Sequence, residues 1–220
     1  MGKLERVLLA GPAGNLEVLI EPHEAARGIA LIAHPHPLYG GSADNKVVTT
    51  LAKALREMGY TTLRPNFRGV GGSEGQHDHG EGETYDLLAV CAYARQRFDS
   101  PRGSSSPSPL PLALAGFSFG AYVITRVAKT LAEHGDPAER LVLVGVATGL
   151  VEGKRSYIAE TVPADTVVIH GSQDETIPLG NVVAWATPLE LPVILVPGAD
   201  HFFHRKLHLI RSIVHSAWQR

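Results

Sequence analysis

A serine with glycines two residues before and two residues after it, in Gly116-Phe117-Ser118-Phe119-Gly120, is the part of this sequence best suited to chemistry. A serine hydroxyl attacks a carbonyl carbon efficiently only when a neighbouring base takes its proton. A sharp turn from a strand into a helix exposes such a serine, and the crowded positions around it require residues with little or no side chain. We therefore predict that Ser118 is a nucleophile at the tip of such a turn.

Ser118 needs a histidine as its base and a carboxylate that orients this histidine. In proteins with this kind of turn the chain order is serine, acid, histidine, and each partner follows a later strand. Asp174 follows the apolar run 167–170, and His201 follows the apolar run 193–196. This position singles out His201 among eleven histidines, and we predict a triad of Ser118, Asp174 and His201.

Two other acidic residues, Glu175 and Asp200, remain alternatives for the carboxylate of the triad. Asp200 adjoins His201, and neighbouring side chains on an extended loop tend to point apart. Both alternatives therefore rank below Asp174.

Hydrolysis through a serine also needs two N–H donors, the oxyanion hole, for the charge that develops on the carbonyl oxygen. One donor is normally the amide after the nucleophile, here Phe119, and the other lies in the loop after an earlier strand. The apolar run 29–33 leads into a loop in which two prolines flank His36 and cannot donate. We predict that His36 supplies the second amide, with Leu38 and Tyr39 as alternatives.

Two other patterns could indicate bound groups, and neither is persuasive. His34 and His36 form a possible metal-binding pair, but no third ligand accompanies them at a recognisable spacing. The glycine-rich segment 69–75 differs from a dinucleotide-binding loop, because Glu74 replaces its third glycine and no helix follows directly. We predict no metal, no cofactor and a loop over the rim of the active site at 69–75. For the neighbouring Arg68 we favour a structural role, with binding of an acidic substrate group as the alternative.

Apolar runs alternate with helical patterns along the chain, which is typical of a parallel sheet with helices on its faces. The opening differs, because the runs 7–9 and 16–20 indicate an antiparallel hairpin. Helices are predicted after the cap residue Asp44 or Asn45, around Leu87–Phe98 and after Ser118. The serine- and proline-rich stretch 100–109 is predicted to be a mobile surface loop and not a domain linker.

The motifs together resemble those of a small, lidless α/β-hydrolase of the dienelactone-hydrolase-like kind, and they cover most of the chain; the residues that carry the resemblance are 34–41, 66–75, 116–120, 170–171, Asp174 and 198–203. The resemblance implies an α/β fold with an eight-stranded, mostly parallel sheet, and it marks Ser118, Asp174 and His201 as the triad. There are two departures. Many members have H-G-G where this chain has His34-Pro35-His36, and dienelactone hydrolases use a cysteine, whereas Cys91 lies within a helical pattern.

Composition agrees with one α/β-hydrolase domain over residues 1–220, since 44% hydrophobic residues can form one sizeable core. A net charge of −2 without a basic stripe indicates neither nucleic acid nor a membrane as a partner. The mixed charges of residues 1–6 do not resemble a signal peptide, and a single cysteine excludes an internal disulfide, so we expect a cytoplasmic protein. The sequence does not indicate an oligomeric state.

The predicted function is hydrolysis of small or soluble carboxylic esters through an acyl-enzyme. About twenty residues separate the apolar run 141–146 from the run that starts at Val167, which is too few for a helical lid, so the site should be open. Four aromatic residues are candidates for an apolar acyl pocket: Tyr39, Phe67, Phe117 and Phe202. Thioester hydrolysis and acyl transfer would use the same triad, and a catalytically idle fold that serves as a binding scaffold is the alternative from another class.

Overall fold

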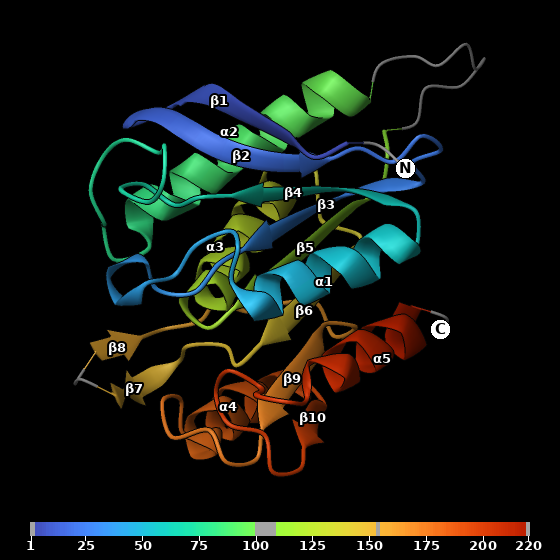
Figure 1. Ribbon diagram of the computed structural model, residues 1–220. Helices are drawn as coiled ribbons and strands as arrows, with labels where there is room; N and C mark the ends of the chain where they lie inside the picture. The colour runs from blue at the N-terminus through green and yellow to red at the C-terminus, as the bar shows by residue number, and fades with distance from the viewer. Residues whose placement is uncertain (1–2, 100–108, 153–154, 219–220) are drawn as a thin grey trace.

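An eight-stranded sheet, in the order β1-β2-β4-β3-β5-β6-β9-β10, forms the centre of the computed structural model, which describes residues 3–99, 109–152 and 155–218 (Figure 1). The strand β2 runs antiparallel to both of its neighbours, β1 and β4, and the other five pairings are parallel, so the predicted eight-stranded, mostly parallel sheet is confirmed. The strands are β1 (Glu5–Gly11), β2 (Gly14–Glu21), β3 (Gly28–Ala33), β4 (Tyr60–Pro65), β5 (Leu112–Phe117), β6 (Arg140–Val144), β9 (Val167–Gly171) and β10 (Val193–Val196).

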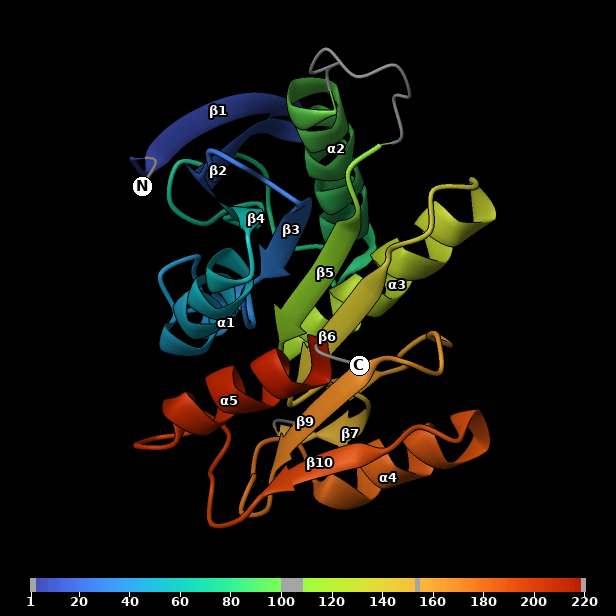
Figure 2. The same cartoon turned by 90° about the vertical axis from the view of Figure 1, so that its right-hand side faces the viewer.

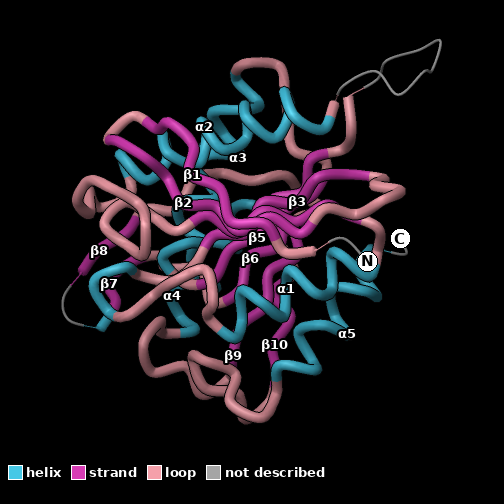
Figure 3. The backbone as a smooth tube through the Cα atoms, turned by 45° about the horizontal axis from the view of Figure 1, so that its top comes forward, coloured by secondary structure: helices cyan, strands magenta, loops and turns pink. Residues whose placement is uncertain are grey.

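Helices cover both faces of this sheet, so the strands form a middle layer (Figures 2 and 3). The helices α1 (Lys46–Glu57) and α5 (Leu207–Trp218) pack on one face, where they share an apolar core with β3, β5, β6 and β9. The helices α2 (Glu81–Phe98), α3 (Phe119–Glu133) and α4 (Leu179–Ala186) cover the opposite face. Because both faces are covered, β3, β5 and β9 are buried along their whole length, which explains their continuous apolar runs.

The local signals in the sequence agree with the observed element boundaries. The predicted hairpin is formed by β1 and β2, which pair through Gly11 and Gly14. Asn45 is the cap of α1, because its side chain accepts a hydrogen bond from the amide of Val47 at 2.9 Å. The predicted loop at 100–109 lies almost entirely outside the described residues.

Two short strands, β7 (Gly149–Val151) and β8 (Arg155–Tyr157), form a separate antiparallel pair between β6 and β9. The described residues of this interval contain no α-helix, which agrees with the predicted absence of a helical lid. The pair lies beside the carboxyl ends of the central strands (Figure 1). It therefore stands at the edge of the sheet where Ser118 is located.

Candidate active site

Ser118 lies at the turn between β5 and α3, in a strained backbone conformation with φ 57° and ψ −120°. Side chains at the neighbouring glycine positions would collide with the backbone. A Cβ atom on Gly116 would lie 2.6 Å from the amide nitrogen of Ala121, and one on Gly120 would meet the carbonyl oxygen of His34. The two glycines therefore permit the tight passage from strand to helix.

Backbone hydrogen bonds fix this turn to the next strand of the sheet. The amide of Ser118 donates to the carbonyl oxygen of Val144 at 2.9 Å, and the carbonyl oxygen of Ser118 accepts from the amide of Ala147 at 3.2 Å. The strained residue is thus held by partners from outside its own turn, which is the condition under which such a conformation persists.

The structure brings Ser118, His201 and Asp174 together in one hydrogen-bonded chain. Nε2 of His201 lies 3.0 Å from Oγ of Ser118, and Nδ1 of His201 lies 2.7 Å from Oδ2 of Asp174. All three residues are buried. With the carboxylate as an acceptor, Nδ1 carries the proton and Nε2 is free to accept one from the serine, which is the orientation that a general base requires.

The loop that carries Asp174 follows β9 and holds the carboxylate firmly. The second oxygen, Oδ1, accepts hydrogen bonds from the amides of Thr176 at 3.0 Å and Ile177 at 2.8 Å. Of the two alternative carboxylates, Asp200 accepts instead from the ring and the amide of His204, and Glu175 is exposed. The geometry therefore favours Asp174 as the partner of His201.

The loop after β3 contains the predicted second donor of the oxyanion hole. In the 3-10 turn η1 (Pro37–Tyr39), the amide of Leu38 donates to Nδ1 of His36, and the amide of Tyr39 donates to the carbonyl oxygen of His36. The two alternative donors are therefore occupied. Within the described residues neither the His36 amide nor the Phe119 amide has a hydrogen-bond acceptor, so both are available to a ligand.

A cavity of about 390 Å³ opens beside Ser118 and His201. The predicted pocket residues Tyr39 and Phe202 line it and are partly exposed. Phe67 and Phe117, the other two predicted pocket residues, do not line the cavity, because both are fully buried in the core. Phe67 packs against His34 and Phe119, and Phe117 packs under the ring of His201 at a centroid distance of 4.9 Å. The prediction that Phe67 and Phe117 line the pocket is wrong.

His34 has a structural role that sequence reasoning missed. Its Nε2 accepts a hydrogen bond from the amide of Phe67 at 2.9 Å, so its Nδ1 carries the proton and donates to the carbonyl oxygen of Pro35 at 2.7 Å. The fully buried imidazole thus ties the His36 loop to the end of β4. Burial lowers the pKa of His34 to about 4, which keeps the ring neutral.

Acid should therefore destabilise the protein through His34. The unfolded chain binds a proton near pH 6.5 and the folded chain only near pH 4, so stability falls as the pH drops through this window. For this one group the loss amounts to about 2–3 kcal/mol between pH 7.5 and 4.5. Urea unfolding at the two pH values should show a smaller loss for His34→Gln than for the wild type. Equal losses would contradict this role, and the exposed His204→Gln is the control.

The glycine-rich segment 69–75 does not lie over the rim of the active site, where the sequence predicted it. Its Ser73 hydroxyl accepts a hydrogen bond from the amide of Glu17 on β2, and positive φ angles at three of its glycines turn the segment back onto the β1–β2 hairpin. Segment 69–75 therefore does not line the cavity beside Ser118. Arg68 has the predicted structural role, because its guanidinium forms two hydrogen bonds with the carboxylate of Asp86 at 2.7 and 2.8 Å.

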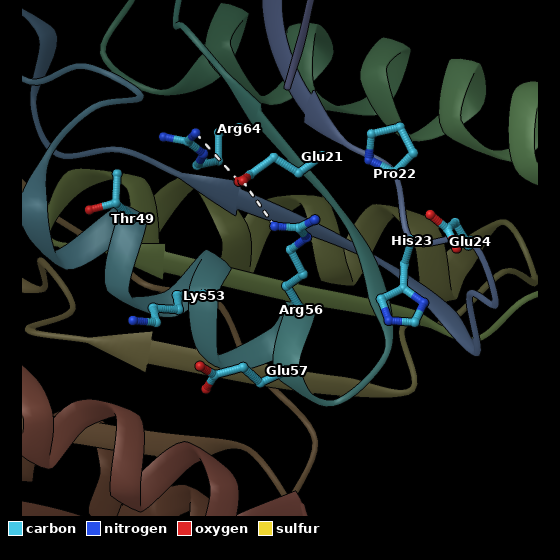
Figure 4. A pocket seen from close by; sticks show the side chains of 9 residues that line it. All are labelled: Glu21, Pro22, His23, Glu24, Thr49, Lys53, Arg56, Glu57 and Arg64. Carbon is cyan, nitrogen blue, oxygen red and sulfur yellow. Dashed lines mark ion pairs between the residues drawn. The ribbon is translucent and has the colours of Figure 1, made fainter. Parts of the chain in front are cut away.

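A second cavity, of about 580 Å³, lies between α1 and the strands β2 and β4 (Figure 4). Its walls are mostly charged side chains, and Glu21 lies 3.6 Å from Arg56 and 3.5 Å from Arg64. Its Thr49 hydroxyl donates to the backbone carbonyl of Lys46 at 3.1 Å. The smaller cavity is the candidate active site, because the Ser118 hydroxyl and the His201 imidazole meet there.

Three further features of the described residues concern metal ions, membranes and the cysteine. They contain no cluster of three or more His, Cys, Asp or Glu side chains that could hold a metal ion. No described helix has the length and hydropathy needed to cross a membrane. Cys91 is buried within α2, and burial raises the pKa of its thiol to about 12, which does not suit a nucleophile.

The sheet, the turn at Ser118 and the short β6–β9 connection define an α/β-hydrolase. No protein-family model matches the sequence. An α/β serine hydrolase without a lid from Xanthomonas campestris is 38% identical, with a TM-score of 0.83 over 99% of this chain and 94% of that chain. An α/β serine hydrolase homologue from Coxiella burnetii is 37% identical, with a TM-score of 0.79 over 98% and 97% of the two chains.

The chain therefore belongs to the α/β serine hydrolases without a lid. A more distant relative is the lysophosphatidylserine lipase ABHD12 of Danio rerio, which is 30% identical over 129 residues. That match covers 57% of this chain and 31% of the zebrafish protein. The similarity is therefore limited to about a third of the much longer zebrafish protein.

Proposed function

We propose that this protein hydrolyses carboxylic esters, with Ser118 as nucleophile, His201 as general base and Asp174 as the group that orients the histidine. The observation that carries the proposal is the hydrogen-bonded chain of these three residues beside an open cavity. The zebrafish relative is a lipase, which supports an ester as the bond that is cleaved.

The geometry suits a reaction in two halves. Ser118 Oγ forms a bond to the carbonyl carbon while its proton moves to Nε2 of His201, and the amides of His36 and Phe119 stabilise the negative charge on the carbonyl oxygen. The intermediate collapses, and the leaving alcohol takes the proton from His201. A water molecule then attacks the acyl-enzyme by the same route, so that the carboxylic acid is released and Ser118 regains its proton.

Thioesters and acyl transfer to another acceptor would use the same groups, because only the leaving group or the acceptor differs. A panel of matched oxygen esters and thioesters separates the first alternative from ester hydrolysis. Product analysis with added alcohols separates the second.

Labelling by a fluorophosphonate tests the whole arrangement, because this reagent reacts rapidly only with a serine that has both a base and an oxyanion hole. We expect intact-protein mass spectrometry to show one adduct on the folded protein, located at Ser118 by peptide sequencing. Denatured protein and the Ser118→Ala variant should show none, whereas Ser156→Ala, which removes an exposed serine of β8, should label normally. Absence of an adduct on folded wild-type protein would favour the idle scaffold.

A further inference from the structure

Arg155, the first residue of β8, extends from the β7–β8 pair to the loop that carries His36. Its guanidinium carbon lies 4.4 Å from the centroid of the Tyr39 ring, at the last position of η1. Both residues line the cavity that contains Ser118. A guanidinium that stacks on an aromatic ring uses its face for this contact and keeps its N–H edge for hydrogen bonds.

The hydrogen-bond partners of Arg155 leave its positive charge without a counterion. Its Nε and Nη2 donate to the backbone carbonyl of Glu152 at 3.1 and 3.0 Å, and its guanidinium also interacts with the hydroxyl of Tyr157. No carboxylate within the described residues lies within ion-pair distance of it. Arg68, Arg95 and Arg211, by contrast, each hold a carboxylate. An arginine that is held in place on the wall of a cavity and lacks a counterion there is prepared to bind an anion.

No other arginine or lysine among the described residues lines this cavity. Of its two histidines, His36 is not a second cation, because burial lowers its pKa to about 4, and Nδ1 of His201 already faces the carboxylate of Asp174. One carboxylate, that of Glu152, lines the same wall. Arg155 is thus the positive group that a substrate anion in the cavity would meet.

We propose that Arg155 binds a carboxylate or phosphate carried by the substrate, so that the protein acts preferentially on anionic esters. The proposal rests on the proposed ester hydrolysis at Ser118. It adds the class of substrate, and it assigns to the β7–β8 pair a role in selecting that class.

The test compares esters that differ in charge but hardly in shape. For the acyl side, the pair is the 4-nitrophenyl monoester of glutaric acid, which is anionic, and 4-nitrophenyl pentanoate, which is neutral. For the alcohol side, the pair is 4-acetoxybenzoate and 4-acetoxybenzamide. In at least one pair, Arg155→Met should lower the anionic-to-neutral ratio of kcat/KM by about 10- to 100-fold, because a charge-assisted hydrogen bond is lost.

Further variants separate the charge of Arg155 from its packing on Tyr39. Arg155→Lys keeps the charge and should restore part of the ratio, whereas Glu152→Gln removes the opposing charge and should raise the ratio by about two- to fivefold. The control is Arg27→Met, since Arg27 also packs over a tyrosine ring, that of Tyr60, but precedes β3 at the opposite end of the sheet.

Two outcomes would overturn the proposal. One is an unchanged ratio in both pairs for Arg155→Met, and the other is an equally low ratio for Arg155→Lys and Arg155→Met. Ester hydrolysis at Ser118 would survive either result, provided that the wild type cleaves the neutral esters and Ser118 takes up fluorophosphonate. A wild type that does neither would instead refute the proposed function.

Discussion

Replacement of His201 with alanine should lower kcat/KM for a short activated ester by about three orders of magnitude or more. The reason is that Nε2 of this residue, 3.0 Å from Oγ of Ser118, is the only base in hydrogen-bond contact with that hydroxyl within the described residues. The oxyanion donors and the cavity would remain, so a small residual rate is expected. Steady-state kinetics with 4-nitrophenyl butyrate, at substrate concentrations below KM, measures the effect.

A matched variant shows whether the loss is specific to the base. His204 lies three residues further along the chain, is exposed, and pairs with Asp200. His204→Ala should therefore keep kcat/KM within about threefold of the wild type, since its exposed side chain bonds Asp200 and makes no hydrogen bond to Ser118, His201 or Asp174. Near-normal activity of His201→Ala would mean that another histidine acts as the base.

The change Asp174→Asn should reduce kcat by about 10⁴-fold without unfolding the protein. The carboxylate accepts the proton of His201 Nδ1 at 2.7 Å, which leaves Nε2 free to accept the serine proton. An asparagine amide can donate to Nδ1, and this favours the tautomer that has its proton on Nε2 and cannot act as a base. The asparagine oxygen can still accept the two loop amides that Oδ1 holds, so the fold should be preserved.

Circular dichroism and urea unfolding check the folding of Asp174→Asn, and kcat measures its function. Glu175→Gln is the matched control, because this neighbour is exposed and its neutralisation should change kcat by less than about threefold. If Glu175→Gln were the damaging substitution and Asp174→Asn were mild, the assignment of the carboxylate would be wrong.

Much of the architecture could be predicted because its signals are local in the sequence. The buried strands are continuous apolar runs, and Gly116 and Gly120 mark a turn that only small residues allow. The chain order of Ser118, Asp174 and His201 follows from the parallel sheet, since each residue comes after the carboxyl end of a strand and these ends lie along one edge.

Features that depend on contacts between distant residues could not be predicted in this way. The strands β7 and β8 have only three residues each, which is too short for a recognisable alternating pattern. The sequence therefore did not predict that Arg155 lines the cavity. Nothing local to His34 indicates that it accepts from the amide of Phe67, 33 residues later. The sequence of β5 alone does not show which face of the sheet Phe117 points to. In the structure its side chain points into the buried core beneath α1 and α5.

The backbone conformation of Ser118 has a consequence for the choice of residue at this turn. A non-glycine residue at φ 57° and ψ −120° carries a strain of about 1–3 kcal/mol, which glycine at the same position would largely avoid. A chain that exchanged this serine for glycine would relieve this strain, offset in part by the larger backbone entropy that glycine loses on folding, and would lose the proposed nucleophile. Folding therefore does not require serine at this turn, and the proposed catalytic role of Ser118 supplies a reason for its presence there.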